Sequence, residues 1–238
     1  MKQAAVDWSN KKVAFTLAEV LITLGIIGIV AALTLPTLIQ NHRNQVVETR
    51  LKHFYSTINQ AITLAELDYG ERENWHNLND VDTDKNGNPV KGQNPREKWL
   101  YKYIVPYMQT VKSNVLTDNY GKPVLYFNNG SALMMRHSTS LDDWGFYPGS
   151  YEKCSKSEKN PSTCSFTFYY HPAYNLKYVG RRFEPYKWGW NGDIKRLERA
   201  CINNEKIHGD IRPRDYCTAF IQSNGWKIPK NYPFKVTY

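Results

Sequence analysis

The order of apolar and polar residues separates an apolar N-terminal segment from a mixed remainder. Residues 20–39 read VLITLGIIGIVAALTLPTLI and contain no charged, amide or imidazole side chain. As a helix this run rises about 30 Å, the thickness of the hydrocarbon core of a bilayer. The pattern predicts one membrane-spanning helix, with its transmembrane part at residues 20–40.

Beyond this run the apolar residues recur at helical spacings of three and four. They are Ile39, Val46, Val47, Leu51, Phe54, Ile58, Ile62 and Ala65. The other faces are expected to carry His42, Arg43, Glu48, Arg50, Lys52, Asn59 and Gln60. The pattern predicts one continuous helix from about Phe15 to Asp68, ended by Gly70 and kinked or loosened at Pro36.

The remainder of the chain is expected to form an antiparallel sheet with short helices. Residues 71–94 have the polar composition of a loop, and Pro95 suits the first position of a helix. One face of that helix is expected to hold Trp99, Tyr103, Tyr107 and Val111. The apolar runs 123–127 and 131–135 flank Asn128-Asn129-Gly130 and predict a hairpin.

Four further elements complete the expected fold. Strands are predicted at residues 165–170 and 176–183, and short helices at residues 194–202 and 214–222. The fold class is therefore α+β, a long N-terminal helix packed on an antiparallel sheet with short additional helices.

Composition narrows the class of protein. The chain has 238 residues, 14% of them aromatic, and a net charge of +9. This aromatic content is enough to build a core, and the mean hydropathy of −0.61 excludes a protein with many membrane spans. No catalytic motif, zinc-ligand spacing or phosphate-binding glycine loop occurs in the sequence, so we expect neither enzymatic activity nor a cofactor.

The apolar segment has two simpler interpretations, a cleaved signal peptide and a plain signal anchor. A signal peptide requires a small-residue cleavage site after the apolar run, and LTLPTLIQN offers none. Lys2, Lys11 and Lys12 outnumber Asp7 before the run, so the positive-inside rule places residues 1–14 in the cytoplasm. Glu19 fits neither interpretation, because drawing a carboxylate into the edge of a membrane segment costs free energy. A charged residue in such a place therefore indicates a functional role. A partner for Glu19 from another chain is therefore expected.

Residues 11–22, KKVAFTLAEVLI, resemble the N-terminal signature of type IV prepilins and type II secretion pseudopilins. That family has a short basic leader, a cut before Phe and a Glu at the fifth position of the mature chain. With Phe15 first, Glu19 is fifth and Pro36 is twenty-second, where many pilins have a helix-bending proline. The residue before the cut is usually Gly, and here it is Ala14.

The resemblance implies a leader at residues 1–14, a long helix at 15–70 and an extracytoplasmic globular domain at 71–238. It implies cleavage and N-methylation by prepilin peptidase, a single pass through the inner membrane, and a periplasmic or extracellular position in a filament. Other pilin or pseudopilin subunits, the inner-membrane assembly platform and membrane lipid are the implied partners. The small residues Gly25, Gly28 and Ala32 are expected to allow close helix packing.

A second interpretation is a membrane-anchored extracytoplasmic binding protein, such as an adhesin or DNA-uptake receptor, that does not polymerise. An uncut N-terminus would favour it. The stretch YVGRRFEPYKWGW at residues 178–190 interleaves basic and aromatic residues, as nucleic-acid-binding surfaces do. We favour a strand with core aromatic rings and solvated arginines for this stretch.

The four cysteines favour disulfides, because their number is even and an exported domain faces an oxidising space. Three pairings are open, as are four reduced thiols, and we prefer the local pairs Cys154–Cys164 and Cys201–Cys217. Asp82-x-Asp84-x-Asn86-Gly87 imitates a calcium loop, but Gln93 replaces the required glutamate, so a polar turn is expected.

Residues 217–221 and 224–229 look like the ending of some bacterial pilin-like proteins.

Overall fold

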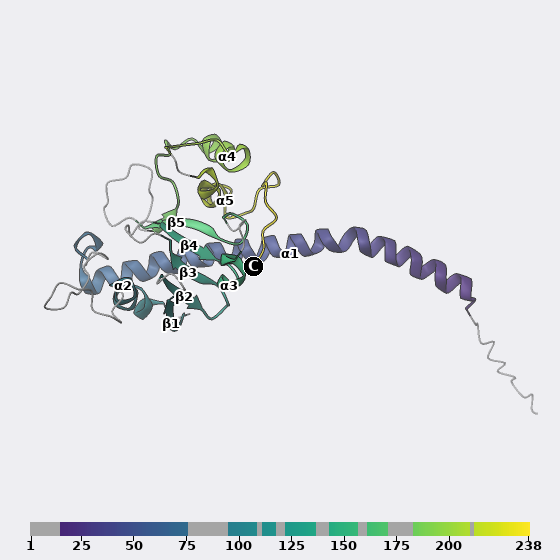
Figure 1. Cartoon of the computed structure of the whole chain (residues 1–238), viewed down its shortest axis with the longest axis horizontal. Helices are drawn as coiled ribbons and strands as arrows, with labels where there is room; N and C mark the ends of the chain where they lie inside the picture. Colours follow the sequence, from purple (N-terminus) through teal and green to yellow (C-terminus); the bar gives the residue numbers. More distant parts are fainter. Residues whose placement is uncertain are drawn as a thin grey trace, which may run out of the picture. The chain divides into compact units, whose positions relative to one another are not determined.

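The computed structural model describes residues 15–75, 95–108, 111–117, 122–136, 143–156, 161–170, 183–209 and 212–238. The chain divides into two compact units, residues 1–41 and 42–238. Helix α1 (Leu17–Tyr69) belongs to both (Figure 1). The predicted long helix is thus confirmed to within two residues at each end, and it remains continuous through Pro36. Gly70 follows it with φ +76°, the left-handed conformation that commonly ends a helix.

The second unit contains a six-stranded antiparallel sheet in which every strand pairs with its neighbours in sequence. The strands are β1 (Val111–Thr117), β2 (Pro123–Phe127), β3 (Ala132–Met135), β4 (Asp143–Tyr147), β5 (Phe166–Tyr170) and β6 (Phe183–Pro185). The predicted hairpin is β2–β3, with Leu125 opposite Leu133, and the strand predicted at 165–170 is β5.

The sequence predictions missed two strands and placed Val111 wrongly on a helix. β1 and β4 were not predicted, and of the strand predicted at 176–183 only Phe183 lies among the described residues. Val111 does not extend a helical face, because it begins β1. Pro106 explains the difference: it has no N–H to donate to the carbonyl four residues earlier, so α2 (Pro95–Tyr103) ends and a 3-10 turn at Val105–Tyr107 follows.

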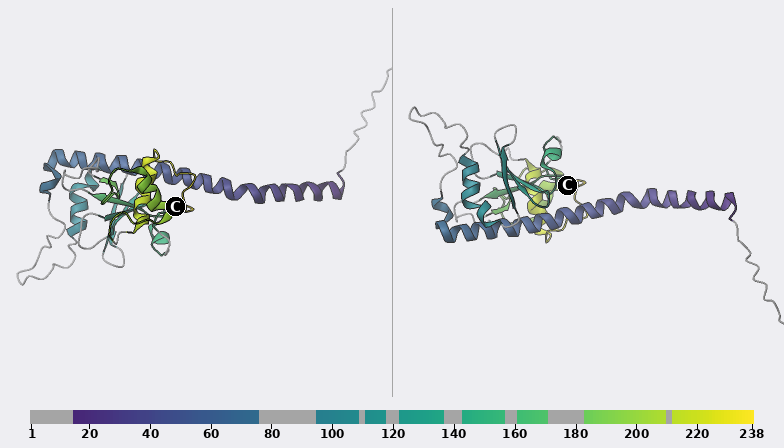
Figure 2. Two further views of the ribbon diagram at one scale, coloured as in Figure 1. Left: turned by 90° about the horizontal axis from the view of Figure 1, so that it is seen from above. Right: turned by 90° about the horizontal axis from the view of Figure 1, so that it is seen from below.

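The short helices lie around the sheet. The two predicted near the C-terminus are α4 (Ile194–Asn203) and a 3-10 turn at Pro213–Tyr216 that continues into α5 (Cys217–Ser223). Helix α3 (Tyr151–Ser155), capped by the Ser150 hydroxyl, was not predicted. Both views of Figure 2 show the second half of α1 running along the globular unit, beside the sheet.

The apolar stripe of α1 forms the main core. Val47, Leu51, Phe54, Ile58, Ile62 and Ala65 are buried as predicted, whereas Val46 is only half buried and Ile39 is exposed. Phe54 stacks on Phe146 of β4 with ring centroids 4.2 Å apart, and its ring also meets Phe127, Phe168 and Phe183 edge-on. One side chain of α1 thereby contacts four of the six strands.

Two polar residues of α1 are buried, contrary to prediction. The Asn59 amide donates to the Phe183 carbonyl at 2.8 Å and accepts from the Phe183 N–H at 3.1 Å. These bonds satisfy backbone groups at the outer edge of β6, the last strand of the sheet. Glu48 accepts from the Ile228 N–H at 2.9 Å and from Lys227 Nζ at 2.8 Å. Both side chains therefore attach distant chain segments to α1.

A second core lies between α4 and α5, and its tyrosines give it an expected pH dependence. Tyr216 is buried, and its hydroxyl donates to the Trp188 carbonyl at 2.7 Å. Burial, and after it the charge of Asp215, raises the pKa of Tyr216 to about 12, and burial also raises the pKa of Tyr186.

We expect this core to lose stability as the pH rises from about 10 to about 12. In that range the unfolded chain releases the Tyr216 proton while the folded chain retains it, so ionisation favours the unfolded state. Urea unfolding of the full chain at a series of pH values measures the slope. Tyr216→Phe should make that slope shallower, and an unchanged slope would contradict the assignment.

Candidate functional site

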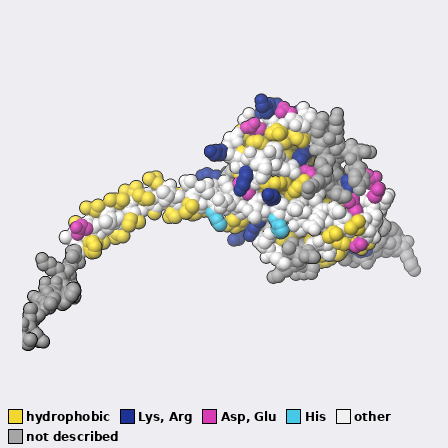
Figure 3. Space-filling view, turned by 180° about the vertical axis from the view of Figure 1, so that it is seen from behind, with side chains coloured by type: hydrophobic (Ala, Val, Ile, Leu, Met, Phe, Trp, Pro, Cys, Tyr) yellow, Lys and Arg dark blue, Asp and Glu magenta, His cyan; other side chains and the backbone are white. Residues whose placement is uncertain are grey.

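The first candidate site is the N-terminal half of α1, whose apolar side chains are exposed. Its most apolar 18-residue window has a mean hydropathy of 2.3, and none of it is buried. Figure 3 shows apolar side chains covering this segment, and Phe15 and Leu33 are 81% and 74% exposed. Among the described residues, α1 is the one helix that is long enough and apolar enough to cross a membrane. N-terminal signal sequences have the same length and apolar composition.

Glu19 lies in the first turn of this helix and caps it. Its carboxylate accepts from the Thr16 N–H at 2.8 Å and from the Thr16 hydroxyl at 2.7 Å, and that hydroxyl accepts from the Glu19 N–H at 3.2 Å. This reciprocal arrangement is a capping box, which satisfies backbone donors that a helix start leaves open. Glu19 therefore has a partner within its own chain.

Thr16 is the residue of this candidate site that sequence reasoning missed. Its signal was present, because Thr16-Leu17-Ala18-Glu19 matches the Ser/Thr-x-x-Glu spacing of a capping box. Two other hydroxyls in the apolar segment are also satisfied: Thr23 donates to the Glu19 carbonyl at 2.9 Å and Thr34 to the Val30 carbonyl at 2.9 Å. These two hydroxyls are thus bonded along the helix, as a membrane environment favours.

The small residues of the segment have free space beside them on the helix surface. A methyl group added at Gly25 or Gly28 would meet nothing within 4 Å beyond its own turn of helix, and Ala32 is exposed. Pro36 lies inside the helix, where it leaves one carbonyl without its usual N–H donor. Phe15 is at the described start of the chain, and Ala14 lies outside the described residues.

Two disulfides brace the globular unit in the predicted pairing. Cys154–Cys164 joins α3 to the segment before β5, and Cys201–Cys217 joins α4 to the start of α5. Their Cα–Cα distances are 5.8 Å and 4.8 Å. All four cysteines are accounted for by these bonds.

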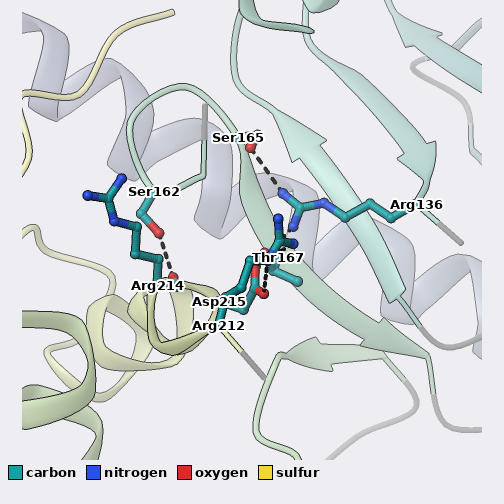
Figure 4. Close-up of polar contacts among 7 residues, drawn as sticks. All are labelled: Arg136, Ser162, Ser165, Thr167, Arg212, Arg214 and Asp215. Carbon is teal, nitrogen blue, oxygen red and sulfur yellow. Dashed lines mark hydrogen bonds and ion pairs between the residues drawn. The ribbon is translucent and has the colours of Figure 1, made fainter. Parts of the chain in front are cut away.

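A polar cluster around Asp215 connects the C-terminal helices to the sheet (Figure 4). The buried Asp215 carboxylate accepts from Arg136 at 3.0 Å, from Arg212 at 3.1 Å and from the Thr167 hydroxyl at 2.7 Å. Arg136 also donates to the Ser165 hydroxyl at 3.0 Å. Because the carboxylate is surrounded by donors, the arrangement is that of a structural link.

The remaining sequence candidates gain no site from the structure. Within the described residues no three His, Cys, Asp or Glu side chains gather as metal ligands. The imitation calcium loop at Asp82–Asn88 lies outside those residues. In the basic and aromatic stretch the strand interpretation is right only in part: Phe183 and Tyr186 are buried, but Trp188 is exposed and Trp190 is only half buried. Residues 178–182 are outside the described part.

Comparison with known proteins places the globular unit in a family. Residues 37–236 match a family of unknown function, DUF6613. The chain belongs to this family. No curated protein and no solved structure matches it.

The DUF6613 match includes the globular unit but not the N-terminal part of the apolar segment. It covers the docked half of α1, the six strands, both disulfides and the Asp215 cluster. Phe15, Glu19, Gly25, Gly28 and Ala32 all precede it. The match therefore rests on the globular unit and its docking helix.

Proposed function

We propose that this chain is a pilin-like structural subunit of a type IV pilus or a type II secretion filament. Prepilin peptidase would remove residues 1–14, and the N-terminal helix would then pack against those of other pilin or pseudopilin subunits. The inner-membrane assembly platform would extract it from the lipid. The role is mechanical, so the proposal assigns no catalytic residue and no cofactor.

The observation that carries the proposal is an exposed apolar helix that continues without a break into the core of a globular unit. None of its most apolar window is buried by its own chain, so lipid or other helices must cover it. Gly25 and Gly28 leave room for a neighbouring backbone to approach closely. The second half of the same helix packs in the core of the globular unit, so that unit is carried wherever the apolar half is inserted.

Two features support a single-pass topology with the globular unit outside the cytoplasm. Lys2, Lys11 and Lys12 precede the apolar segment, which favours retention of residues 1–14 in the cytoplasm. The globular unit contains two disulfides, and such bonds form and persist in oxidising spaces such as the periplasm. Once assembled, the subunit would be periplasmic or extracellular.

N-terminal mass spectrometry of the membrane and filament fractions tests the proposal. The mature chain should begin at Phe15 and carry a methylated α-amino group. Ala14→Gly, which restores the residue usual before the cut, should be processed at least as completely, whereas Ala14→Phe should leave a precursor that begins at Met1.

Either of two results would contradict the proposal. A wild-type protein that retains Met1 would indicate the alternative function, a membrane-anchored binding protein that does not polymerise. A terminus after residue 30 would indicate an ordinary signal peptide.

A further inference from the structure

A cavity of about 230 Å³ lies between α1 and the turn that joins β2 to β3. Its inner wall is apolar and consists of the buried side chains of Phe54, Met108, Phe127 and Phe146. An apolar cavity of about 150 Å³ is large enough to hold a benzene molecule. This cavity therefore has room for an aromatic ring with a short side chain.

The rim of the cavity is polar and rich in hydrogen-bond donors. Arg50, His53 and Thr57 reach it from successive turns of α1, and Asn128 and Asn129 from the opposite turn. None of the described residues that line the cavity is an aspartate or a glutamate. The rim therefore carries a positive charge and offers no negative charge to repel an anion.

Arg50 is held in position at this rim by its own chain. Its guanidinium donates to the Pro148 carbonyl and lies 5.3 Å from the centre of the Tyr238 ring. A guanidinium has five N–H donors, so these contacts leave donors available for another acceptor. A side chain that is already fixed loses less conformational freedom when a ligand binds, which favours affinity.

A neighbouring groove provides an internal comparison. It is lined by Thr49, Lys52, Ser56 and other residues on the side of α1 that faces the Gly225–Lys227 turn, and His53 lines both hollows. The groove includes Glu48, whose carboxylate already binds Lys227 and the Ile228 N–H. The groove therefore contains both signs of charge, whereas the described lining of the cavity combines an apolar wall with basic and neutral groups.

We propose that the cavity is a binding site for a small organic acid that consists of one apolar ring or branched chain and one carboxylate. The apolar body would replace water against the phenylalanine wall, and the carboxylate would accept charge-assisted hydrogen bonds from Arg50 at the rim. This proposal concerns the globular unit and does not depend on filament assembly.

Ligand-observed NMR on the full chain in lipid nanodiscs tests the site, with empty nanodiscs subtracted to remove partition into lipid. The probes are 3-phenylpropionate and its amide, which share one shape and differ in charge. We expect saturable binding of the acid with a dissociation constant on the order of 1 mM, and binding of the amide that is weaker by about tenfold.

Two pairs of variants locate the binding. Thr57→Phe places a ring in the cavity and should abolish binding, whereas Ser56→Phe places the same ring one residue away, on the groove, and should preserve it. Arg50→Gln should remove the preference for the acid over the amide, whereas Lys52→Gln removes an equal charge from the groove and should leave the preference unchanged.

Three results would overturn the proposal. They are the absence of saturable binding, equal binding of acid and amide by the wild type, and binding that survives Thr57→Phe in a chain whose circular dichroism matches the wild type. Because Thr57→Phe leaves Arg50 and its contact with Pro148 in place, the test does not depend on the stability of the Arg50 variant.

Discussion

Replacing Glu19 with leucine should lower incorporation of the chain into filaments by about tenfold or more, while membrane insertion and cleavage before Phe15 remain normal. Cleavage would create a positive α-amino group at Phe15, at the end of an apolar helix. In a staggered bundle that group can lie beside Glu19 of a neighbouring subunit. Pairing the two charges between subunits would remove two desolvation penalties at once.

The contact between Glu19 and Thr16 makes a sharper control available. Glutamine at position 19 keeps the capping-box hydrogen bonds but has no charge. If the charge drives assembly, Glu19→Gln should fail as Glu19→Leu does, and Glu19→Asp should be intermediate because its reach is shorter. If capping is the only role, Glu19→Gln should behave as the wild type.

The measurement is the ratio of subunit in the sheared filament fraction to subunit in the membrane fraction, at matched expression. N-terminal mass spectrometry of the same membrane fraction shows whether each variant was cut. Normal incorporation of Glu19→Leu would contradict the pairing role, and a loss of cleavage would show that the residue acts earlier, at processing.

Sequence patterning predicted the parts of the fold that depend on local periodicity. Leu51, Phe54, Ile58 and Ile62 recur at helical spacing, and the sheet buries that stripe. Asn59 could not be recognised as a core residue in the same way, because the backbone groups that satisfy it belong to Phe183, 124 positions away. A buried polar residue is predictable only when its partners are known, and those partners come from tertiary structure.

Strand β4 shows a second limit of sequence patterning. Its sequence, DWGFY, contains an aspartate and a glycine, both of which are depleted in strands. The structure explains the glycine: a methyl group at Gly145 would lie 2.9 Å from the Arg136 side chain. The same glycine that made the strand hard to predict therefore leaves space for Arg136, which binds Asp215.

The candidate site was predictable to a similar extent. Glu19 was recognisable because a charge next to an apolar run is unusual, and the disulfides were recognisable because local pairing was the simplest choice. The Asp215 cluster was not recognisable, since it joins residues from β5, the end of β3 and the C-terminal helices. We expect this cluster to contribute to the stability of the globular unit.

Asp215→Ala should therefore destabilise the globular unit by about 3–5 kcal/mol, the range found when one partner of a buried ion pair is removed. The Arg136 side chain is only 11% exposed, and without Asp215 its charge would lose its carboxylate. The Thr167 hydroxyl would lose an acceptor at the same time. Asp215→Asn should be less damaging, because its amide oxygen still accepts hydrogen bonds.

The measurement is urea unfolding of the full chain in nanodiscs, with both disulfides oxidised and tryptophan fluorescence as the signal. The matched control is Glu205→Ala, which breaks the ion pair with Arg199 at side chains that are 45% and 47% exposed. Exposed pairs contribute about 0–1 kcal/mol, so that variant should unfold close to the wild type. A loss of stability in Asp215→Ala no larger than in Glu205→Ala would show that the cluster does not hold the C-terminal helices to the sheet.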